Sequence, residues 1–148
     1  MRLRPNLLLG GVLVGCVVAI ALAAQVWTPI DPLRTNLRRR IAAPDATYWL
    51  GTDEFGRDVF SRLMVGASTS VSVALATVVL ALLLGGAAGL AGGYFRGRLD
   101  RILGALTDAL LAFPGILLAL GLLSVLGPSR WGIVLALGLA YAPTVARV

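Results

Sequence analysis

The stretch VSVALATVVLALLLGGAAGL, residues 71–90, carries no charged side chain and lies within a longer uncharged interval between Arg62 and Arg96. At about 1.5 Å of rise per residue, a helix of about 20 apolar residues covers the roughly 30 Å hydrocarbon core of a bilayer. Tyr94 and Phe95 stand at the end of the interval, and aromatic side chains gather at lipid–water boundaries. The stretch therefore predicts a membrane-spanning helix.

Three further apolar runs flank this one, at residues 7–26, 102–126 and 131–146. Asp108 and Pro114 interrupt the run at 102–126, and the run at 131–146 contains Pro143 and is slightly short for an upright span. Gly127, Pro128 and Ser129 separate these two runs and predict a turn. We expect an all-α, polytopic transmembrane protein with about four helices.

The composition independently indicates a membrane protein. Hydrophobic residues make up 58% of the chain, charged residues only 14%, and the mean hydropathy is +0.89. The net charge of +6 comes from arginine alone, and the arginines are spread between apolar runs instead of forming one patch with stacking aromatics. We therefore expect no nucleic-acid partner. Cys16 is the only cysteine, so it forms no internal disulfide and is expected to serve in packing.

The first apolar run has two interpretations. Arg2 and Arg4, the apolar stretch after them and the small-residue sequence Ala21-Leu22-Ala23 fit a cleaved signal peptide. The same run also fits a retained anchor helix, because it continues past that cleavage pattern to Trp27, an interfacial type of residue. We favour the anchor.

Residues 28–67 form a polar segment with prolines at three positions, which predicts an extramembrane region. At its end, residues 58–67 place apolar side chains on one helical face, with Asp58 and Arg62 four apart on the other. We expect a short amphipathic helix there, lying on the membrane.

Most of the polar signals of the chain lie in LGTDEFGRDVFSRL, residues 50–63. This segment, continued to Gly66, resembles the LGTDxxGRDxxSRLxxG motif of the C-type permease subunits of bacterial dipeptide, oligopeptide and nickel ABC importers. The resemblance continues through residues 92–127, which look like the second loop and the third helix of that family, with its DxxLAFP element. The motif residues carried over are Gly51, Thr52, Asp53, Gly56, Arg57, Asp58, Ser61 and Arg62.

The resemblance implies a type I ABC importer permease fold with six expected helices, of which this chain would be the N-terminal portion. Residues 1–69 would form the anchor helix and the extracytoplasmic segment, and residues 70–148 the first part of the permease domain, ending before the coupling loop. The implied function is a transmembrane permease subunit for peptides or nickel, in the bacterial inner membrane. The implied partners are a B-type permease subunit, ATP-binding subunits that use the ATP, an extracytoplasmic substrate-binding protein and the lipid bilayer.

Within the motif, Thr52 or Asp53 can cap a following turn, Gly56 permits a backbone conformation that other residues resist, and Arg57 can pair with Asp58. We favour this scaffold role. The alternative is that the charges contact the substrate or the delivering binding protein.

Two residues in the third run are candidates for the pathway or for a helix kink. A carboxylate such as Asp108 in an apolar stretch is costly against lipid, and structural pairing or capping is favoured over substrate contact. Pro114 removes a backbone hydrogen bond and bends the helix, either for packing or for a pathway that opens on alternating sides. Gly85, Gly89 and Gly93 recur at small-xxx-small spacing, which predicts a close helix contact.

Two other classes of function compete with a permease. An intramembrane enzyme is disfavoured, because the chain has no histidine and neither a nucleophile with its base nor a pair of aspartates can be assembled; we expect no catalytic, cofactor-binding or metal site. A small helical scaffold or adaptor in the membrane is the remaining alternative.

The arginine count on each side of the membrane does not decide the orientation. The short segments around the first two helices, and the arrangement that the resemblance implies, favour a cytoplasmic N-terminus. With that orientation the cytoplasmic side would hold Arg2, Arg4, Arg96, Arg98, Arg101 and Arg147, and the outer side Arg34, Arg38, Arg39, Arg40, Arg57, Arg62 and Arg130.

Overall fold

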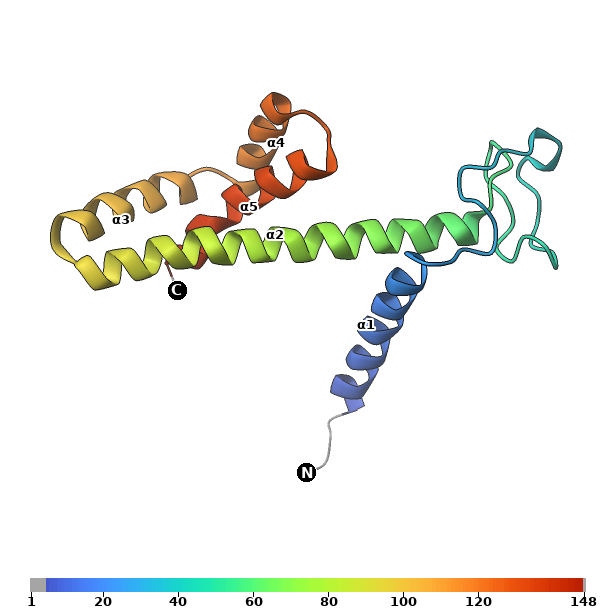
Figure 1. The fold of residues 1–148 in the computed structure, drawn as a ribbon, viewed down its shortest axis with the longest axis horizontal. Coiled ribbons are helices and arrows are strands. Elements are labelled where there is room, and N and C mark those ends of the chain that lie inside the picture. Colours follow the sequence, from blue (N-terminus) through green and yellow to red (C-terminus); the bar gives the residue numbers. More distant parts are fainter. Residues whose placement is uncertain (1–4, 148) are drawn as a thin grey trace. The chain divides into compact units, whose positions relative to one another are not determined.

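The computed structural model describes residues 5–147, and these residues form helices and loops without any strand. The elements are α1 (Pro5–Ala23), the single-turn helix η1 (Leu37–Arg39), α2 (Val59–Phe95), α3 (Gly97–Leu111), α4 (Gly115–Leu126) and α5 (Arg130–Ala146) (Figure 1). The all-α prediction is confirmed. Arg2 and Arg4, on which the signal-peptide interpretation and part of the arginine count depend, lie outside the described residues, as does Val148.

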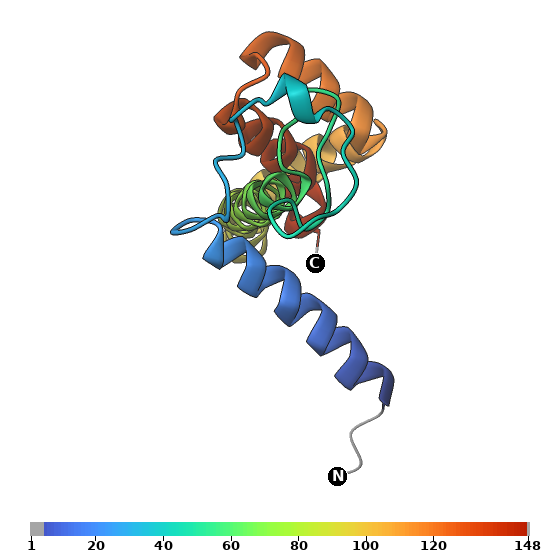
Figure 2. The same cartoon turned by 90° about the vertical axis from the view of Figure 1, so that its right-hand side faces the viewer.

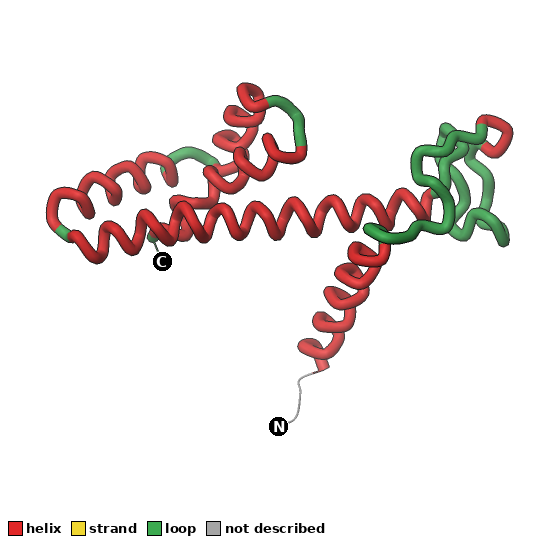
Figure 3. Tube along the Cα trace, viewed as in Figure 1, coloured by secondary structure: helices red, strands yellow, loops and turns green. Residues whose placement is uncertain are grey.

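The chain divides into two units, Met1–Ser72 and Val73–Val148, and α2 contributes its first part to one and its remainder to the other. In the first unit, α1 ends at Ala23 in a turn in which the amide of Trp27 donates to the carbonyl of Ala23 (2.9 Å). From there to the start of α2 the backbone forms loops with only η1 between them (Figure 3).

The expected short amphipathic helix at residues 58–67 is not a separate element, because Val59 begins the same helix that continues without a break to Phe95. No proline interrupts this sequence. The hydroxyls of Thr69 and Ser72 donate to the carbonyls of Val65 (3.0 Å) and Thr69 (2.9 Å), so they follow the helical turns instead of ending them. The polar–apolar boundary in the sequence is therefore not a boundary between helices.

The third predicted span is two helices, α3 and α4, whose axes differ in direction by 92°. Pro114 is responsible, since a proline has no N–H to donate and disfavours helical backbone at the residue before it. α3 begins at Gly97, five residues before the apolar run at 102–126. The prediction of a bend at Pro114 agrees with this geometry, but the bend is far sharper than a kink within one helix.

Two helices of the described chain are long and apolar enough to cross a membrane, in the ranges Asn6–Ala23 and Val59–Phe95. The number becomes three if α3 and α4 together form one bent span, and α5 is a shorter apolar helix. In the second unit, α5 returns beside α4 after the turn at Gly127 and also contacts α3 (Figures 1 and 2). The side-chain oxygen of Ser129 caps α5 by accepting a hydrogen bond from the amide of Gly132 (2.9 Å).

Candidate functional site

Asp53 is the centre of the Gly51–Arg62 motif. Its Oδ1 accepts hydrogen bonds from the backbone amides of Phe55 (2.9 Å) and Arg57 (3.0 Å), and its Oδ2 accepts from Nε of Arg57 (2.8 Å) and Nη1 of Arg62 (2.7 Å). Both arginines thus form ion pairs with one carboxylate. The Asp53 side chain therefore closes the turn at Gly56 and connects this turn to the first turn of α2.

These contacts also set the charge state of Asp53. Partial desolvation raises the pKa of Asp53, but the amides of Arg57 and Phe55 and the Arg57 guanidinium outweigh it and lower that pKa to about 2. The carboxyl group is therefore ionised throughout the physiological range. Its negative charge is what holds the two arginines in place.

Asp58 has a different role from the predicted one. We expected it to pair with Arg57 and to face Arg62 one helical turn on, but both arginines bind Asp53 instead. The Asp58 side chain is buried, with 2% exposed, and caps α2: its Oδ2 accepts from the amide (2.9 Å) and the hydroxyl (2.6 Å) of Ser61. Oδ1 of Asp58 has no partner among the described residues.

Ser61 and Thr52 connect this turn to distant parts of the loop. The fully buried Oγ of Ser61 accepts a hydrogen bond from the amide of Ile30 (3.1 Å), 31 residues away. The hydroxyl of Thr52 accepts from the amide of Ala42 (2.9 Å) and donates to the carbonyl of Arg39. Two short side chains therefore connect the motif to Ile30, Arg39 and Ala42 in the preceding loop.

The two motif glycines are required by the backbone. Gly51 and Gly56 both have φ of +72°, which side chains disfavour. A Cβ at Gly56 would also collide with the backbone of Asn36, and one at Gly51 would collide with the carbonyl oxygen of Ala42. All eight motif residues are therefore engaged in holding the segment together, which supports the scaffold role; the alternative contact with a binding protein or substrate stays a prediction.

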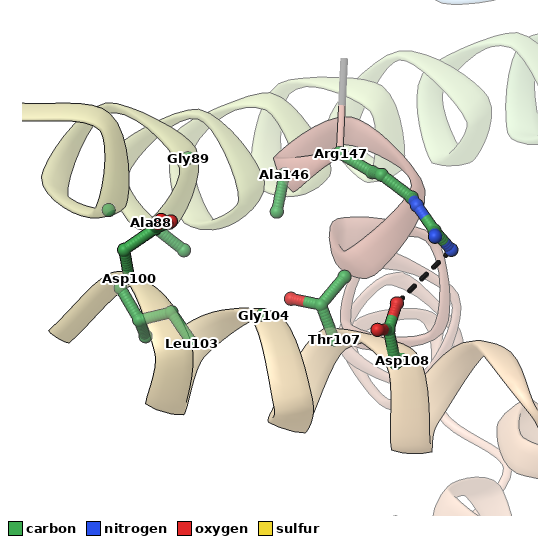
Figure 4. Close-up of a pocket in the computed structure, with 10 residues that line it drawn as sticks. Ala88, Gly89, Asp100, Leu103, Gly104, Thr107, Asp108, Ala146 and Arg147 are labelled. Atoms are coloured by element: carbon green, nitrogen blue, oxygen red, sulfur yellow. Dashed lines mark ion pairs between the residues drawn. The ribbon is translucent and has the colours of Figure 1, made fainter. Parts of the chain in front are cut away.

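A second polar cluster lies in the unit Val73–Val148, in a pocket of about 260 Å³ between the end of α2, α3 and the end of α5 (Figure 4). Asp100, Thr107 and Asp108 line it from α3, and Arg147 lines it from the end of α5. Nη1 of Arg147 forms an ion pair with Oδ1 of Asp108 (3.1 Å), and about two thirds of each side chain is exposed. Asp108, a pathway or capping candidate in the sequence, is thus placed in a pair that ties α5 to α3.

Small residues on α2 line the pocket and let α5 approach the helix closely. A Cβ at Gly85 would meet the carbonyl oxygen of Ala142 and the Val145 side chain, and one at Gly89 would lie 2.8 Å from the carbonyl oxygen of Ala146. Gly93 has open space at the same position, so the structure brings two of the three predicted packing glycines against α5 and leaves the third away from it.

Several residues of this contact were not singled out from the sequence. Thr77 and Ala81 are buried and precede Gly85 at intervals of four, so they lie on the same face of α2, and Gly92 faces Asp100 of α3. Gly138 of α5 accommodates the Leu80 side chain. The spacing of four residues from Thr77 to Gly89 could have predicted this contact face of α2 from the sequence. No such spacing marks the positions on α5 that contact it.

Pro114 stands between α3 and α4 and accepts hydrogen bonds through its carbonyl oxygen from the amides of Leu117 (2.9 Å) and Leu118 (3.1 Å). It therefore both ends one helix and starts the next. Within residues 5–147, no three His, Cys, Asp or Glu side chains lie close enough together to hold a metal ion.

Comparisons with known proteins agree on one class of relatives. No family model matches the chain. It is similar to the dipeptide transport system permease protein of Alkalihalophilus pseudofirmus, with 35% identity over 99% of this chain and 49% of that protein. It is also similar to the nickel transport system permease protein of Escherichia coli K12, with 34% identity over 98% of this chain and 52% of that protein.

A third relative is the glutathione transport system permease protein of Pectobacterium atrosepticum, with 35% identity over 93% of this chain and 46% of that protein. The chain spans about half the length of these curated relatives. The similarity covers both the loop built around Asp53 and the helices that form the polar pocket.

Proposed function

This chain belongs to the family of permease proteins of bacterial dipeptide, nickel and glutathione transport systems, and from that premise we propose that it forms part of the substrate pathway of an ABC importer. The substrates we propose are peptides, from dipeptides to oligopeptides, or nickel. The observation that carries the proposal is the similarity over 99% of the chain to a dipeptide permease. The helices of a length and composition that can cross a membrane support it.

The partners that we propose follow from the same premise. A B-type permease subunit would complete the pathway, separate ATP-binding subunits would bind and hydrolyse ATP, and an extracytoplasmic binding protein would deliver the substrate. The chain itself would then hold no cofactor and carry out no enzymatic reaction. Its contribution would be to bind lipid and line the pathway.

The direct test is uptake in the organism that encodes the chain. A strain lacking the gene is compared with its parent for uptake of a labelled dipeptide, labelled glutathione and radioactive nickel. We expect one of the three uptake rates to fall to the background rate and to recover when the gene is restored. Unchanged uptake of all three, with the protein present in the parent's membranes, would favour the scaffold alternative.

A matched pair of variants sharpens the same test. Gly56→Ala places a methyl group against the backbone of Asn36, whereas Gly66→Ala adds one in open space on α2. Restoration by Gly66→Ala but not by Gly56→Ala would connect uptake to the folded extramembrane segment.

We also propose a membrane location with the N-terminus in the cytoplasm, for which the short basic segments give the argument. Single cysteines at Thr35 or Arg98, in a Cys16→Ser background, can be labelled in intact spheroplasts with a maleimide that does not cross membranes. Labelling at residue 35 but not at residue 98 is the expected result. The reverse pattern would contradict the orientation.

A further inference from the structure

Three arginines with exposed side chains lie where α2 ends and α3 begins: Arg96 between the two helices, and Arg98 and Arg101 within the first five residues of α3. None of the three forms an ion pair with any residue in the range 5–147. Asp100, the one acid in the turn, points toward α2: a Cβ at Gly92 would lie 3.2 Å from its Oδ1 (Figure 4). The turn therefore presents three positive charges that the described chain leaves uncompensated.

Two exposed aromatic side chains precede these arginines. Tyr94 and Phe95 are 82% and 68% exposed and pack edge to face, with ring centroids 5.1 Å apart. The rings stand at the end of the uncharged part of α2 that follows Arg62, and aromatic rings in such a place are typical of the boundary between hydrocarbon and headgroups. The end of α2 thus has the side chains of a membrane interface, with the cations directly beyond them.

The helix that follows has a second apolar face. Leu103, Thr107 and Leu110 of α3 are partly buried, but Leu99, Ile102 and Leu106 are exposed and lie on one face by their spacing of three and four. Arg98 borders this exposed apolar face. A helix with exposed apolar residues beside basic ones is the usual form of a segment at the surface of an anionic membrane.

We propose that the basic turn, defined as Tyr94–Arg101, binds the phosphate headgroups of anionic phospholipids, with the apolar face of α3 against the acyl chains. The guanidinium groups of Arg96, Arg98 and Arg101 donate to the lipid phosphate oxygens, for which their planar geometry is suited. An acidic protein surface would satisfy the three charges but not the exposed aromatic pair and the leucine–isoleucine face. The combination of the two favours lipid.

The test uses the full chain, purified in a mild detergent and titrated with phosphatidylglycerol or with phosphatidylcholine of the same acyl chains. Bound lipid is counted by native mass spectrometry. We expect tighter binding of phosphatidylglycerol than of phosphatidylcholine. Each arginine near an anionic surface contributes about a factor of five, so Arg98→Gln with Arg101→Gln raises the dissociation constant for phosphatidylglycerol about 25-fold and leaves that for phosphatidylcholine unchanged.

Two control variants make the result specific. Arg34→Gln with Arg38→Gln removes the same amount of charge from the extramembrane loop, where both side chains are exposed, and should leave phosphatidylglycerol binding unchanged. Arg98→Lys with Arg101→Lys keeps the charge and should stay within about threefold of the wild type, which separates loss of charge from misfolding.

Equal affinity of the wild type for the two lipids would overturn the proposal. So would an equal loss of affinity in the turn variant and in the loop control, because attraction to the net charge of the protein would then account for the binding. The test is independent of transport, so its failure leaves the proposed permease function untouched.

Discussion

The loop around Asp53 and the face of α2 from Thr77 to Gly92 both hold a neighbouring segment close to their own backbone, by opposite means. In the loop, polar side chains reach across the turn and bond to backbone groups, as Thr52 does with Ala42 and Arg39. On the α2 face the side chains are small or absent, so that α5 approaches the helix backbone at Gly85 and Gly89.

The difference follows from the solvent. In an extramembrane segment with little apolar core, directed hydrogen bonds and ion pairs have to define the conformation. Between helices in lipid there is little hydrophobic driving force, since lipid is as apolar as the side chains, and close van der Waals contact takes its place. Glycine occurs in both regions for different reasons. In the loop it adopts a positive φ, and on α2 its missing side chain leaves space for α5.

The largest expected effect is on the loop. Gly56→Ala introduces a Cβ at a φ of +72° and directly against the backbone of Asn36, which cannot move like a flexible side chain. We expect a loss of about 2–5 kcal/mol in the stability of the loop, from the backbone angle and the overpacking together. Denaturant unfolding in detergent, in a Trp27→Phe, Trp131→Phe background and followed by the fluorescence of Trp49, measures it.

The matched control is Gly66→Ala, where no atom lies within 4 Å of the new methyl group and the position is inside α2. This change should be neutral or stabilise by up to about 1 kcal/mol, because alanine favours a helix more than glycine does. If Gly56→Ala were as stable as this control, glycine would not be needed for the turn.

The second prediction concerns the α2 face. Gly85→Ala places its methyl group against Ala142 and Val145, so α5 has to shift, at a cost of about 1–3 kcal/mol. Gly86→Ala and Gly93→Ala, each with open space at the new Cβ, are the controls and should have no such effect. Thermal unfolding in detergent compares the three. An equal loss at all of them would contradict contact with α5 as the cause, because alanine itself favours the helix at each position.

The sequence was sufficient for features with a strong local cause. The apolar runs, the breaking role of Pro114 and the left-handed backbone at Gly56 each follow from the chemistry of a few adjacent residues. The sequence did not predict the continuous helix from Val59 to Phe95. The polar residues around Ser70 mark a change in the surroundings of the chain, and a helical backbone can continue through such a change.

The choice of partners could not be predicted in the same way. Arg57 has an acid on each side along the chain, Asp53 and Asp58, and spacing alone does not show that Asp58 turns inward to cap α2. The contacts of Ser61 with Ile30 and of Thr52 with Arg39 join residues far apart in sequence. Such pairings depend on the path of the loop, which no local pattern encodes.

The third prediction tests the charge on Asp53. Because its pKa is lowered to about 2, below the ordinary value of 3.8, its contribution to loop stability is complete above about pH 4 and is lost as the pH falls toward 2. In a Trp27→Phe, Trp131→Phe background, the fluorescence of Trp49, which packs on Phe60 (ring centroids 5.2 Å apart), should change over that interval.

Asp53→Asn should remove much of this pH dependence and loosen the loop already at pH 7, whereas Glu54→Gln, a neighbouring exposed acid, should keep the wild-type profile. Asp45 titrates in the same direction, because the amides of Tyr48 and Thr47 lower its pKa, so a smaller dependence should persist in Asp53→Asn. A profile identical to that of the wild type would show that Asp53 does not control the loop.

The smallest effect is expected at the one ion pair of the polar pocket. Asp108 and Arg147 are both about two thirds exposed, and pairs of that kind contribute less than about 1 kcal/mol, in contrast to the partly buried pairs of Asp53. A double-mutant cycle with Asp108→Asn and Arg147→Gln, followed by thermal unfolding in low and high salt, should give a coupling below that value that weakens with salt. A coupling of about 2 kcal/mol or more, insensitive to salt, would mean that the pair is shielded from water. In that case the helices of this unit would be held by directed polar contacts as the loop is, and the contrast between the two regions would fail.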